Sequence, residues 1–311
     1  MTLPALPAGF PEPDLQNDKV RLWFNLPEPL YRHELKSISQ STLKSGVKSA
    51  ADLRHAMTAE FKESPAMLKG TCAHQFILEP SGEALMERAP DGYTGNKKAD
   101  QELKDAKQAE GITLVPQDLY DDALAITEVV ESSDMAQTLL GEYDGTDEWE
   151  KWSEVSMQWV HHSDPSVVIK GRIDRMQVHP DRISLIDLKT ANPSSFEAWR
   201  ERKFKYDMQE MMIQASLYRQ AIHHAKGLLN RLGKPVTWHW IIIESEPPFK
   251  MQFLTPNERM IKVGNSAVEL CINRYSRGMK TDEWPGYAET IIDFSTLPPW
   301  SYQYAKETVA S

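Results

Sequence analysis

The sequence predicts an α/β (α+β) fold, in which helices surround a central β-sheet. Residues 167–191 (VVIKGRIDRMQVHPDRISLIDLKTA) place β-branched and apolar residues on both sides of a turn, which is typical of an antiparallel hairpin. Residues 238–244 (WHWIIIE) are almost wholly apolar, as in a strand at the centre of a sheet. Amphipathic segments of helical length lie before and after these strands, so the two element types alternate along the chain.

The hairpin turn has its centre between Pro180 and Asp181. Asp174 and Asp187 are equally far from that centre, so we expect them directly opposite each other, with Cβ atoms about 4.5–5.5 Å apart. Lys189, two residues beyond Asp187, projects from the same face. Two carboxylates held this close repel each other, and a divalent cation is the usual partner for two hard oxygen ligands. The pattern therefore predicts a metal site, with a lysine that orients or helps to deprotonate a water molecule.

A second interpretation gives these residues no chemistry. Asp174 would pair with Arg172 or Arg175, and Asp187 would be a solvated charge on the hairpin. The run SLIDL counts against this interpretation, because it embeds Asp187 in an apolar strand where an unpaired charge is costly. The residues therefore favour the metal site.

The hairpin resembles the PD-(D/E)XK nuclease signature. The matching residues are Gly171, Arg172, Asp174 and the run 187–191 (DLKTA). Within that superfamily the sequence is most similar to the RecE (exonuclease VIII) group of phage recombination exonucleases. The resemblance implies a PD-(D/E)XK nuclease core, with a mixed central β-sheet flanked by helices.

The resemblance extends over nearly the whole chain and implies one domain with tails. We expect the exonuclease domain at residues 37–301, an extended N-terminal arm at residues 1–36 and a C-terminal tail at residues 302–311. The beginning of the arm holds four prolines and few periodic apolar residues, which favours an extended segment without a core of its own.

Composition indicates a soluble globular protein, with 41% hydrophobic and 26% charged residues in a chain of 311. No apolar run approaches the roughly 18 residues that span a membrane, and the N-terminus lacks the pattern of a signal peptide. We therefore expect a cytoplasmic protein without a membrane partner, and the resemblance implies a bacterial host cell and a phage or prophage origin. Iron–sulfur members of the superfamily need four cysteines, and this chain has two.

The net charge of −10, from 35 basic and 45 acidic side chains, is not that of a general nucleic-acid binder. An enzyme can confine its basic residues to a channel and keep an acidic exterior. A basic cluster follows the hairpin, and the alternative interpretation of that cluster is a solvated helix face. With the arginine next to the first aspartate, the candidate DNA-binding residues are Arg172, Arg200, Arg202, Lys203 and Lys205.

A serine followed by proline predicts the start of a helix at residues 64–79. His74 has Gly70 and Thr71 on the preceding turn of its own face, and these small side chains leave room for another backbone or an ion. A lone histidine on a helix is more often structural. The run GTCAHQFILEP resembles the family's helix that carries an active-site histidine, and this resemblance implies that His74 binds metal.

Further helices are expected at residues 37–57, 97–109, 118–140, 206–226 and 255–279, and a strand at residues 152–161. Glu154 lies on that strand, from which a carboxylate can join a metal shell directly or through water; the alternative is an exposed glutamate. His161 and His162 are expected at the surface, because neither their spacing nor a strand face brings both rings to one point.

Two glutamines compete for a role on the helix at residues 206–226. Gln214 and Tyr218 are four residues apart and share a face, which matches the Q-x3-Y element of RecB-type nucleases. Gln209 lies twenty positions after Lys189, in a Tyr-x-x-Gln setting that resembles the RecE group. The glutamines point roughly 140° apart, so they cannot serve one purpose. Spacing favours Gln209, and both remain candidates.

The activity that the resemblance implies is phosphodiester hydrolysis with one or two Mg²⁺ ions, for which Mn²⁺ substitutes. The implied ligands are His74, Asp174, Asp187 and the backbone carbonyl of Leu188. Lys189 would orient the attacking water or stabilise developing charge. The implied substrate is linear double-stranded DNA, degraded from the 5′ end to leave a 3′ single-stranded tail.

The family also implies a homo-oligomeric ring around DNA and a RecT-like single-strand annealing protein as partner. Two alternatives share the same residues. A PD-(D/E)XK endonuclease of the restriction or repair type would cut internally, and a catalytically inactive module would only bind DNA.

Overall fold

The computed structural model of the 311-residue chain describes residues 3–60, 63–79, 86–141, 149–192, 205–287 and 289. Within these residues, the main sheet has eight strands in the order β1-β2-β6-β7-β8-β9-β10, and β3 pairs with β7 beside this path. The strands are β1 Leu15–Gln16, β2 Val20–Trp23, β3 Ile38–Ser39, β6 Glu150–Val160, β7 Val168–Val178, β8 Ile183–Ala191, β9 Val236–Glu244 and β10 Met251–Leu254. The sheet is mixed, because β7 and β8 pair antiparallel whereas β8 and β9 pair parallel.

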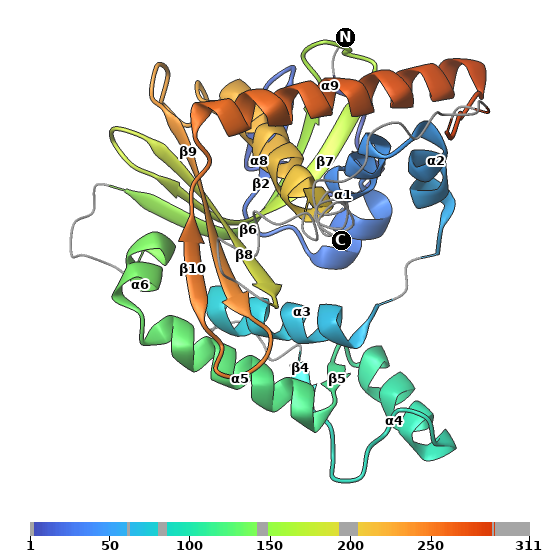
Figure 1. Cartoon of the computed structure of the whole chain (residues 1–311), viewed down its shortest axis with the longest axis vertical. Helices are drawn as coiled ribbons and strands as arrows, with labels where there is room; N and C mark the ends of the chain where they lie inside the picture. The colour runs from blue at the N-terminus through green and yellow to red at the C-terminus, as the bar shows by residue number, and fades with distance from the viewer. Residues whose placement is uncertain are drawn as a thin grey trace, which may run out of the picture.

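Helices cover both faces of the sheet (Figure 1). On one side are α1 Gln40–Leu43, α2 Ala50–Thr58, α8 Lys205–Ala225 and α9 Glu258–Thr281. On the other side are α3 Pro65–Leu78, α5 Gln117–Glu131 and α6 Asp134–Leu140. A 3₁₀ helix, η2 Lys44–Val47, completes the first group. A π-helix, η1 Leu30–Glu34, contacts Lys170 and Arg172 of β7.

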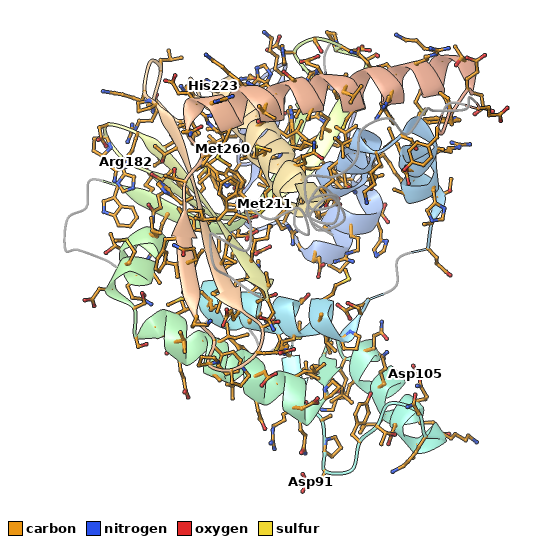
Figure 2. The ribbon with its side chains drawn as sticks, viewed as in Figure 1. Asp91, Asp105, Arg182, Met211, His223 and Met260 are labelled. Carbon is orange, nitrogen blue, oxygen red and sulfur yellow. The ribbon has the colours of Figure 1, made fainter. Side chains whose placement is uncertain are left out.

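A smaller lobe extends beyond α5 (Figure 1). It contains helix α4 Lys98–Ala109 and a two-stranded sheet of β4 Met86–Arg88 and β5 Thr113–Val115. Asp91 and Asp105 lie on this lobe, far from α8 and α9 (Figure 2). No residue of α4 is buried, and the helix agrees with the one that the sequence predicts at residues 97–109.

The central strands are buried on both faces. In β9, Trp238 and Trp240 pack into the core beneath α8 and α9, whereas Ile241 and Ile243 pack into the core formed with α3 and α5. Successive strand residues point to opposite faces, so a strand covered on both sides must be apolar throughout. The run WHWIIIE predicts a central strand, and β9 is an interior strand that pairs with β8 on one side and with the edge strand β10 on the other.

The N-terminal segment differs from the separate extended arm expected at residues 1–36. Strand β2 pairs antiparallel with β6 and extends the main sheet. Val20 and Leu22 are fully buried in the same core as the central strands. The alternation of apolar residues in VRLW supplies one buried face, and the pairing covers the edge of β6.

Two predicted helices are interrupted. The helix expected at residues 118–140 is divided into α5 and α6, because Ser133 accepts a hydrogen bond from the Ala136 amide and begins a new helix. The stretch at residues 37–57 is divided among β3, α1, η2 and α2. Serine side chains bind neighbouring backbone groups, which favours such boundaries.

Both cysteines, Cys72 and Cys271, are buried free thiols. Within the part of the chain that the structure describes, no helix combines the length and the apolar character needed to cross a membrane.

Candidate active site

The predicted hairpin is formed by β7 and β8. The amide of His179 donates to the carbonyl of Arg182 at 2.9 Å across the turn. Pairing continues from the turn to Arg175 and Ile186, which is the register that the sequence predicts. One further step would pair Asp174 with Asp187, but the ladder ends before it.

Strand alternation breaks at Asp174. Ile173 and Met176 are three residues apart, yet both lie in the core on the α8 side, although strand side chains alternate between faces. At this break, the Leu188 amide donates to Asp174 Oδ2 at 2.7 Å. The Asp174 carboxylate thus takes the place of a backbone acceptor for the Leu188 amide, and this hydrogen bond fixes the carboxylate against β8.

Glu154 faces Asp174 from the other neighbouring strand, β6. The residues on either side of Glu154 pair regularly with β7, but Glu154 itself has a φ of 50°. This left-handed conformation is uncommon outside glycine, and strained residues often occur at functional sites. Glu154, Asp174 and Asp187 therefore come from three adjacent strands, β6, β7 and β8.

His74 reaches the same place from α3. Its Nε2 lies 2.9 Å from the Leu188 carbonyl, and its Nδ1 lies 3.8 Å from Asp174 Oδ2. Gly70, one turn earlier, permits this approach, because a Cβ at that position would lie 3.0 Å from Thr190 Oγ1 on β8. The small residue noted beside His74 in the sequence therefore lets the helix pack against the hairpin.

The residues at this point fit a divalent cation. His74, Glu154 and Asp174 each offer a ligand atom, and all three atoms lie within 4.8 Å of one another. Carboxylate and carbonyl oxygens suit hard cations such as Mg²⁺, and imidazole nitrogen is accepted by Mn²⁺ and Zn²⁺. The 2.9 Å between His74 Nε2 and the Leu188 carbonyl matches an octahedral edge of roughly 3.0 Å for bonds of about 2.1 Å.

Asp187 lies beside this group and is 2% exposed. Gln214 Nε2 donates to Asp187 Oδ1 at 2.7 Å, and Lys189 Nζ lies 2.7 Å from Oδ2. Oδ2 is buried and ion-paired with Lys189, so Gln214 holds one oxygen of Asp187 and Lys189 holds the other. A cation bound at Oδ2 would share that oxygen with Lys189.

Spacing favours Gln209, but Gln214 is the glutamine of α8 that contacts the hairpin, through its hydrogen bond to Asp187. Gln209 is five residues earlier on α8, on a face roughly 140° away. Tyr218, one turn after Gln214, accepts a hydrogen bond from the Arg172 amide at 3.2 Å. A side chain at Gly171 would overlap the Tyr218 ring, so this glycine allows α8 to lie flat on β7.

Arg172, a candidate for DNA contact, is turned inward. Its guanidinium donates to the Leu26 carbonyl at 2.9 Å and to Ser156 Oγ at 3.0 Å, and it lies 3.9 Å from Glu154 Oε2. It also stacks 4.5 Å from the centre of the Tyr31 ring. Arg172 therefore positions Glu154, and Tyr31 is a component that sequence analysis missed because it lies in the segment expected to be an arm.

The other candidate DNA-binding residues are not placed. Arg200, Arg202 and Lys203 lie outside the described residues, and so does the side chain of Lys205, the first residue of α8.

A groove with a volume of about 1400 Å³ opens beside the site. Thr71 lines it and precedes His74 by three residues, so both share one face of α3. The groove is lined by the cationic or titratable side chains of Arg32, His33 and Lys36 and by the carboxylates of Glu28, Glu60 and Glu63. His74 and the three carboxylates are not among the described residues that line the groove.

Glu154 and Asp174 retain protons more strongly than ordinary acids because their pKa values are raised. Burial, and then the charge of Asp174, raises the pKa of Glu154 to about 8. Burial, and then the charge of Asp187, raises the pKa of Asp174 to about 6. Burial lowers the pKa of Lys189, but the charges of Asp187 and Asp174 outweigh burial and raise it above its ordinary value. The lysine is therefore a cation, and the carboxylates need further positive charge to ionise together.

Over residues 37–294 the chain matches the family described as a PDDEXK-like domain of unknown function (DUF3799), and it belongs to that family. Among solved structures, it is similar to a putative exonuclease from Eubacterium rectale, with a TM-score of 0.53 and 12% identity over 90% of this chain and 98% of that one. At that identity the likeness shows the fold alone.

Two further structures have TM-scores too low to indicate a shared fold. The first is SSO0001, with a TM-score of 0.27 and 12% identity over 81% of this chain and 98% of that one. The second is protein VC1899 from Vibrio cholerae, with a TM-score of 0.24 and 12% identity over 84% of this chain and 58% of that one. Among curated proteins, none matches the sequence. Family membership confirms the predicted PD-(D/E)XK core and supports a nuclease, a class of enzyme that uses divalent metals.

Without metal, the free energy of unfolding is expected to fall as pH rises. The folded pKa values of Asp174 (about 6) and Glu154 (about 8) exceed their ordinary values of 3.8 and 4.5. The folded chain therefore holds more protons than the unfolded chain, and the stability present at low pH is lost as pH rises through these values. Urea unfolding in EDTA at a series of pH values measures this slope. The buried His161, whose pKa is lowered to about 4, acts in the opposite direction, so the test compares wild type with Asp174→Asn. Asp174→Asn should lose less stability than wild type between about pH 5 and about pH 8, and an unchanged pH dependence would contradict the assignment.

Gln214→Ala is expected to weaken Mn²⁺ binding by about 10- to 100-fold, because outer partners orient the ligands that they contact. Gln209→Ala is the matched control on the same helix and should leave the affinity within about threefold, the scatter of a single unrelated change. Calorimetric titration of both variants measures the difference. Equal losses in both, or a larger loss in Gln209→Ala, would show that the wrong face of α8 has been assigned.

Proposed function

We propose that this chain is a metal-dependent exodeoxyribonuclease, which degrades linear double-stranded DNA in the 5′→3′ direction and leaves 3′ single-stranded overhangs. The observation that carries the hydrolase part is the convergence of Glu154, Asp174 and Asp187 from three adjacent strands, with His74 and Lys189 beside them. Direction and substrate rest on the resemblance to the RecE group.

The proposed site would hold Mg²⁺, for which Mn²⁺ substitutes, on Asp174, Asp187, His74 and the Leu188 carbonyl, with Glu154 as a direct or water-mediated partner. A bound cation of this kind polarises the phosphate and lowers the pKa of the attacking water. Lys189 stays protonated, so it acts as a donor to the water or to the phosphate oxygen rather than as a base. Gln214 holds Asp187 in place during the reaction.

Action at DNA ends is favoured over internal cutting by two likenesses. One is the sequence resemblance to recombination exonucleases, and the other is the fold shared with a protein described as a putative exonuclease. An endonuclease of the restriction or repair type would use the same residues, and closed circular DNA separates the two activities because an exonuclease needs an end.

The resemblance also supports a homo-oligomeric ring around DNA, with a RecT-like single-strand annealing protein as partner in phage-type recombination. A ring would reconcile the net charge of −10 with DNA binding, because basic side chains would line the channel and acidic ones would face outward. Encirclement would keep the enzyme on one substrate through many cleavage steps.

Digestion of end-labelled linear DNA and closed circular DNA tests the activity. We expect loss of linear DNA alone, in Mg²⁺ or Mn²⁺ but not in EDTA, and release of the 5′ label before the 3′ label. Asp187→Ala should slow digestion at least about 100-fold, because it removes a charged group aimed at the reacting phosphate. Asp181→Ala is the matched control, since Asp181 is an exposed aspartate at the tip of the same hairpin.

Other outcomes of the digestion lead to different enzymes. Cutting of the circle would indicate the endonuclease, and early release of the 3′ label would reverse the polarity. If no metal supports digestion, a catalytically inactive DNA-binding module would be the better explanation.

Sedimentation velocity tests the assembly. We expect a closed oligomer at assay concentrations, and a larger complex when a RecT-like annealing protein is added. A monomer at the concentration that digests DNA would contradict the ring, and an unchanged profile after addition would contradict the partner.

A further inference from the structure

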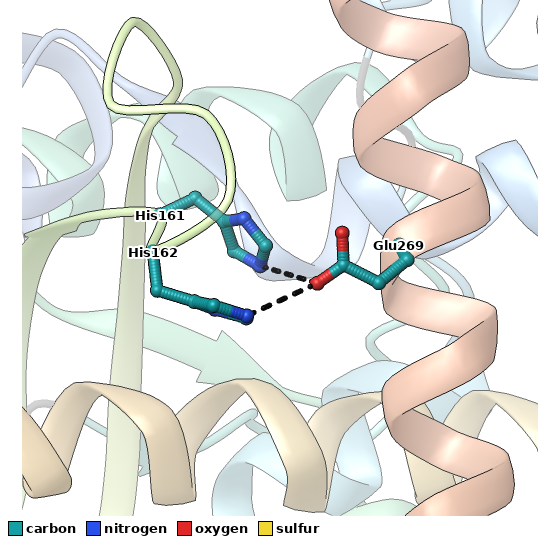
Figure 3. A group of neighbouring side chains, drawn as sticks. All are labelled: His161, His162 and Glu269. Carbon is teal, nitrogen blue, oxygen red and sulfur yellow. Dashed lines mark ion pairs between the residues drawn. The ribbon is translucent and has the colours of Figure 1, made fainter.

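A second group of metal-ligating side chains lies where β6 ends against α9 (Figure 3). His161 and His162 directly follow β6, and Glu269 lies on α9. The Nε2 atoms of His161 and His162 are 3.9 Å and 3.3 Å from the same oxygen, Glu269 Oε1. His162 is exposed, as expected, but His161 is buried, and the expectation that the two rings cannot meet is wrong because the chain bends after β6 and brings both toward α9.

His161 is fully buried, with 0% of its side chain exposed, although its polar ring faces this group. Its Nε2 has no hydrogen-bond partner among the described residues. Buried polar atoms are nearly always satisfied, so an orphaned imidazole nitrogen aimed at a carboxylate requires an explanation.

The other nitrogen of His161 indicates which atom carries the proton. Ser163 Oγ lies 2.9 Å from His161 Nδ1 and donates its one proton to Glu269 Oε2 at 2.7 Å. The hydroxyl must therefore accept from Nδ1–H, which leaves a lone pair on Nε2. The Ser163 amide, at 3.3 Å from Nδ1, favours the opposite tautomer, in which Nε2–H would donate to the buried Oε1 of Gln220.

This arrangement is typical of a histidine ligand. Imidazoles that bind metal usually donate their second ring N–H to an oxygen, which fixes the tautomer and the ring orientation. Here Ser163 receives that proton and passes a hydrogen bond to the carboxylate that shares the site. Without a cation, the Nε2 lone pair of His161 points toward a carboxylate oxygen, an unfavourable contact.

The distances suit a tetrahedral ion. Bonds of about 2.0–2.1 Å to nitrogen and oxygen place neighbouring tetrahedral ligands roughly 3.3–3.4 Å apart. The observed 3.3 Å for His162 matches that edge, and the 3.9 Å for His161 exceeds it by about 0.5 Å, so the His161 ring would move slightly toward the ion. Two imidazoles and one carboxylate form a ligand set that Zn²⁺ commonly takes.

The group opens into a small pocket, which leaves access for the ion. The pocket has a volume of about 320 Å³ and is lined by His162, Gln220, His223, His224, Asn265 and Glu269. His223 lies on α8 where that helix approaches α9 (Figure 2). A fourth ligand, either water or an imidazole from α8, can therefore complete the tetrahedron.

This group is separate from the candidate active site. His161 follows Glu154 by seven residues, about 23 Å at roughly 3.3 Å per residue of extended strand. An ion here would join the connection between β6 and β7 to α9, so its effect would be structural.

We propose that His161, His162 and Glu269 bind one divalent transition-metal ion of the Zn²⁺ class, which fastens the end of β6 to α9. This inference does not depend on the nuclease activity. The rival explanation is Gln220, whose Oε1 is also buried without a hydrogen bond and which could satisfy His161 after a small rotation.

The test is equilibrium dialysis of the full-length chain against Zn²⁺ after removal of metal with EDTA, with bound zinc measured per chain. The active site also binds divalent cations, so the measurement is made in an Asp174→Ala background. We expect one zinc per chain to remain. Adding His162→Ala or Glu269→Gln to this background should weaken zinc binding more than about 10-fold. Removing a residue that only hydrogen-bonds to a metal ligand already costs about 10-fold in affinity, and these two residues are ligands.

The variants are chosen to keep the chain folded. His162 is half-exposed, and Glu269→Gln preserves size, whereas a change at the buried His161 would also disturb packing. His55→Ala, an exposed histidine on α2, is the matched control and should not change zinc binding. The visible spectrum with Co²⁺ in place of zinc should show the intense bands of tetrahedral coordination, and these should disappear with His162→Ala.

Three results would overturn the proposal. They are loss of all zinc in Asp174→Ala alone, unchanged affinity in both His162→Ala and Glu269→Gln, and equal loss in His55→Ala. The first would place the zinc in the active site, and the second would favour Gln220 as the partner of His161.

Discussion

The structure depends on how it tolerates three carboxylates on adjacent strands. Glu154 and Asp174 are partly buried in the sheet and Asp187 is almost wholly buried, and their mutual repulsion and desolvation oppose folding. Each has a different compensation. Arg172 lies near Glu154, the Leu188 amide donates to Asp174, and Gln214 and Lys189 hold Asp187.

These compensations explain the surrounding architecture. Helix α8 must lie close to β7 and β8 for Gln214 to reach Asp187, and Gly171 removes the side chain that would prevent this. Helix α3 must lie close to β8 for His74, and Gly70 has the same effect there. The layered core therefore positions the site, because each helix that buries the sheet also delivers one polar side chain to the carboxylates.

Local patterns were enough to predict part of this arrangement. The register of the hairpin could be predicted from its turn, because the two strands are adjacent in sequence. Strand β9 could be predicted from its apolar run, because a strand covered on both faces needs apolar residues at every position. The cap at Ser64 and the helix of His74 were likewise local. Glu154 lies beside Asp174 because Glu154 itself adopts a left-handed backbone conformation within β6, which the conformational preferences of glutamate do not predict.

Other features depend on contacts between distant segments, and local patterns cannot reveal them. Spacing along the chain favoured Gln209, but the packing of α8 on Gly171 selects the face that carries Gln214. The inward turn of Arg172 depends on Leu26 and Tyr31, which precede it by more than a hundred residues. The meeting of His161 and His162 with Glu269 likewise requires α9 to cross the end of β6.

The contacts around the hairpin close chain loops of very different length. Asp174 and Leu188 are 14 residues apart, Gln214 and Asp187 are 27 apart, and His74 and Leu188 are 114 apart. The entropy lost on closing a loop grows with the logarithm of its length, so the histidine contact costs about 2 kcal/mol more than the aspartate contact. The hairpin turn alone holds Asp174 near Leu188, whereas the His74 contact depends on the packing of segments from distant parts of the domain.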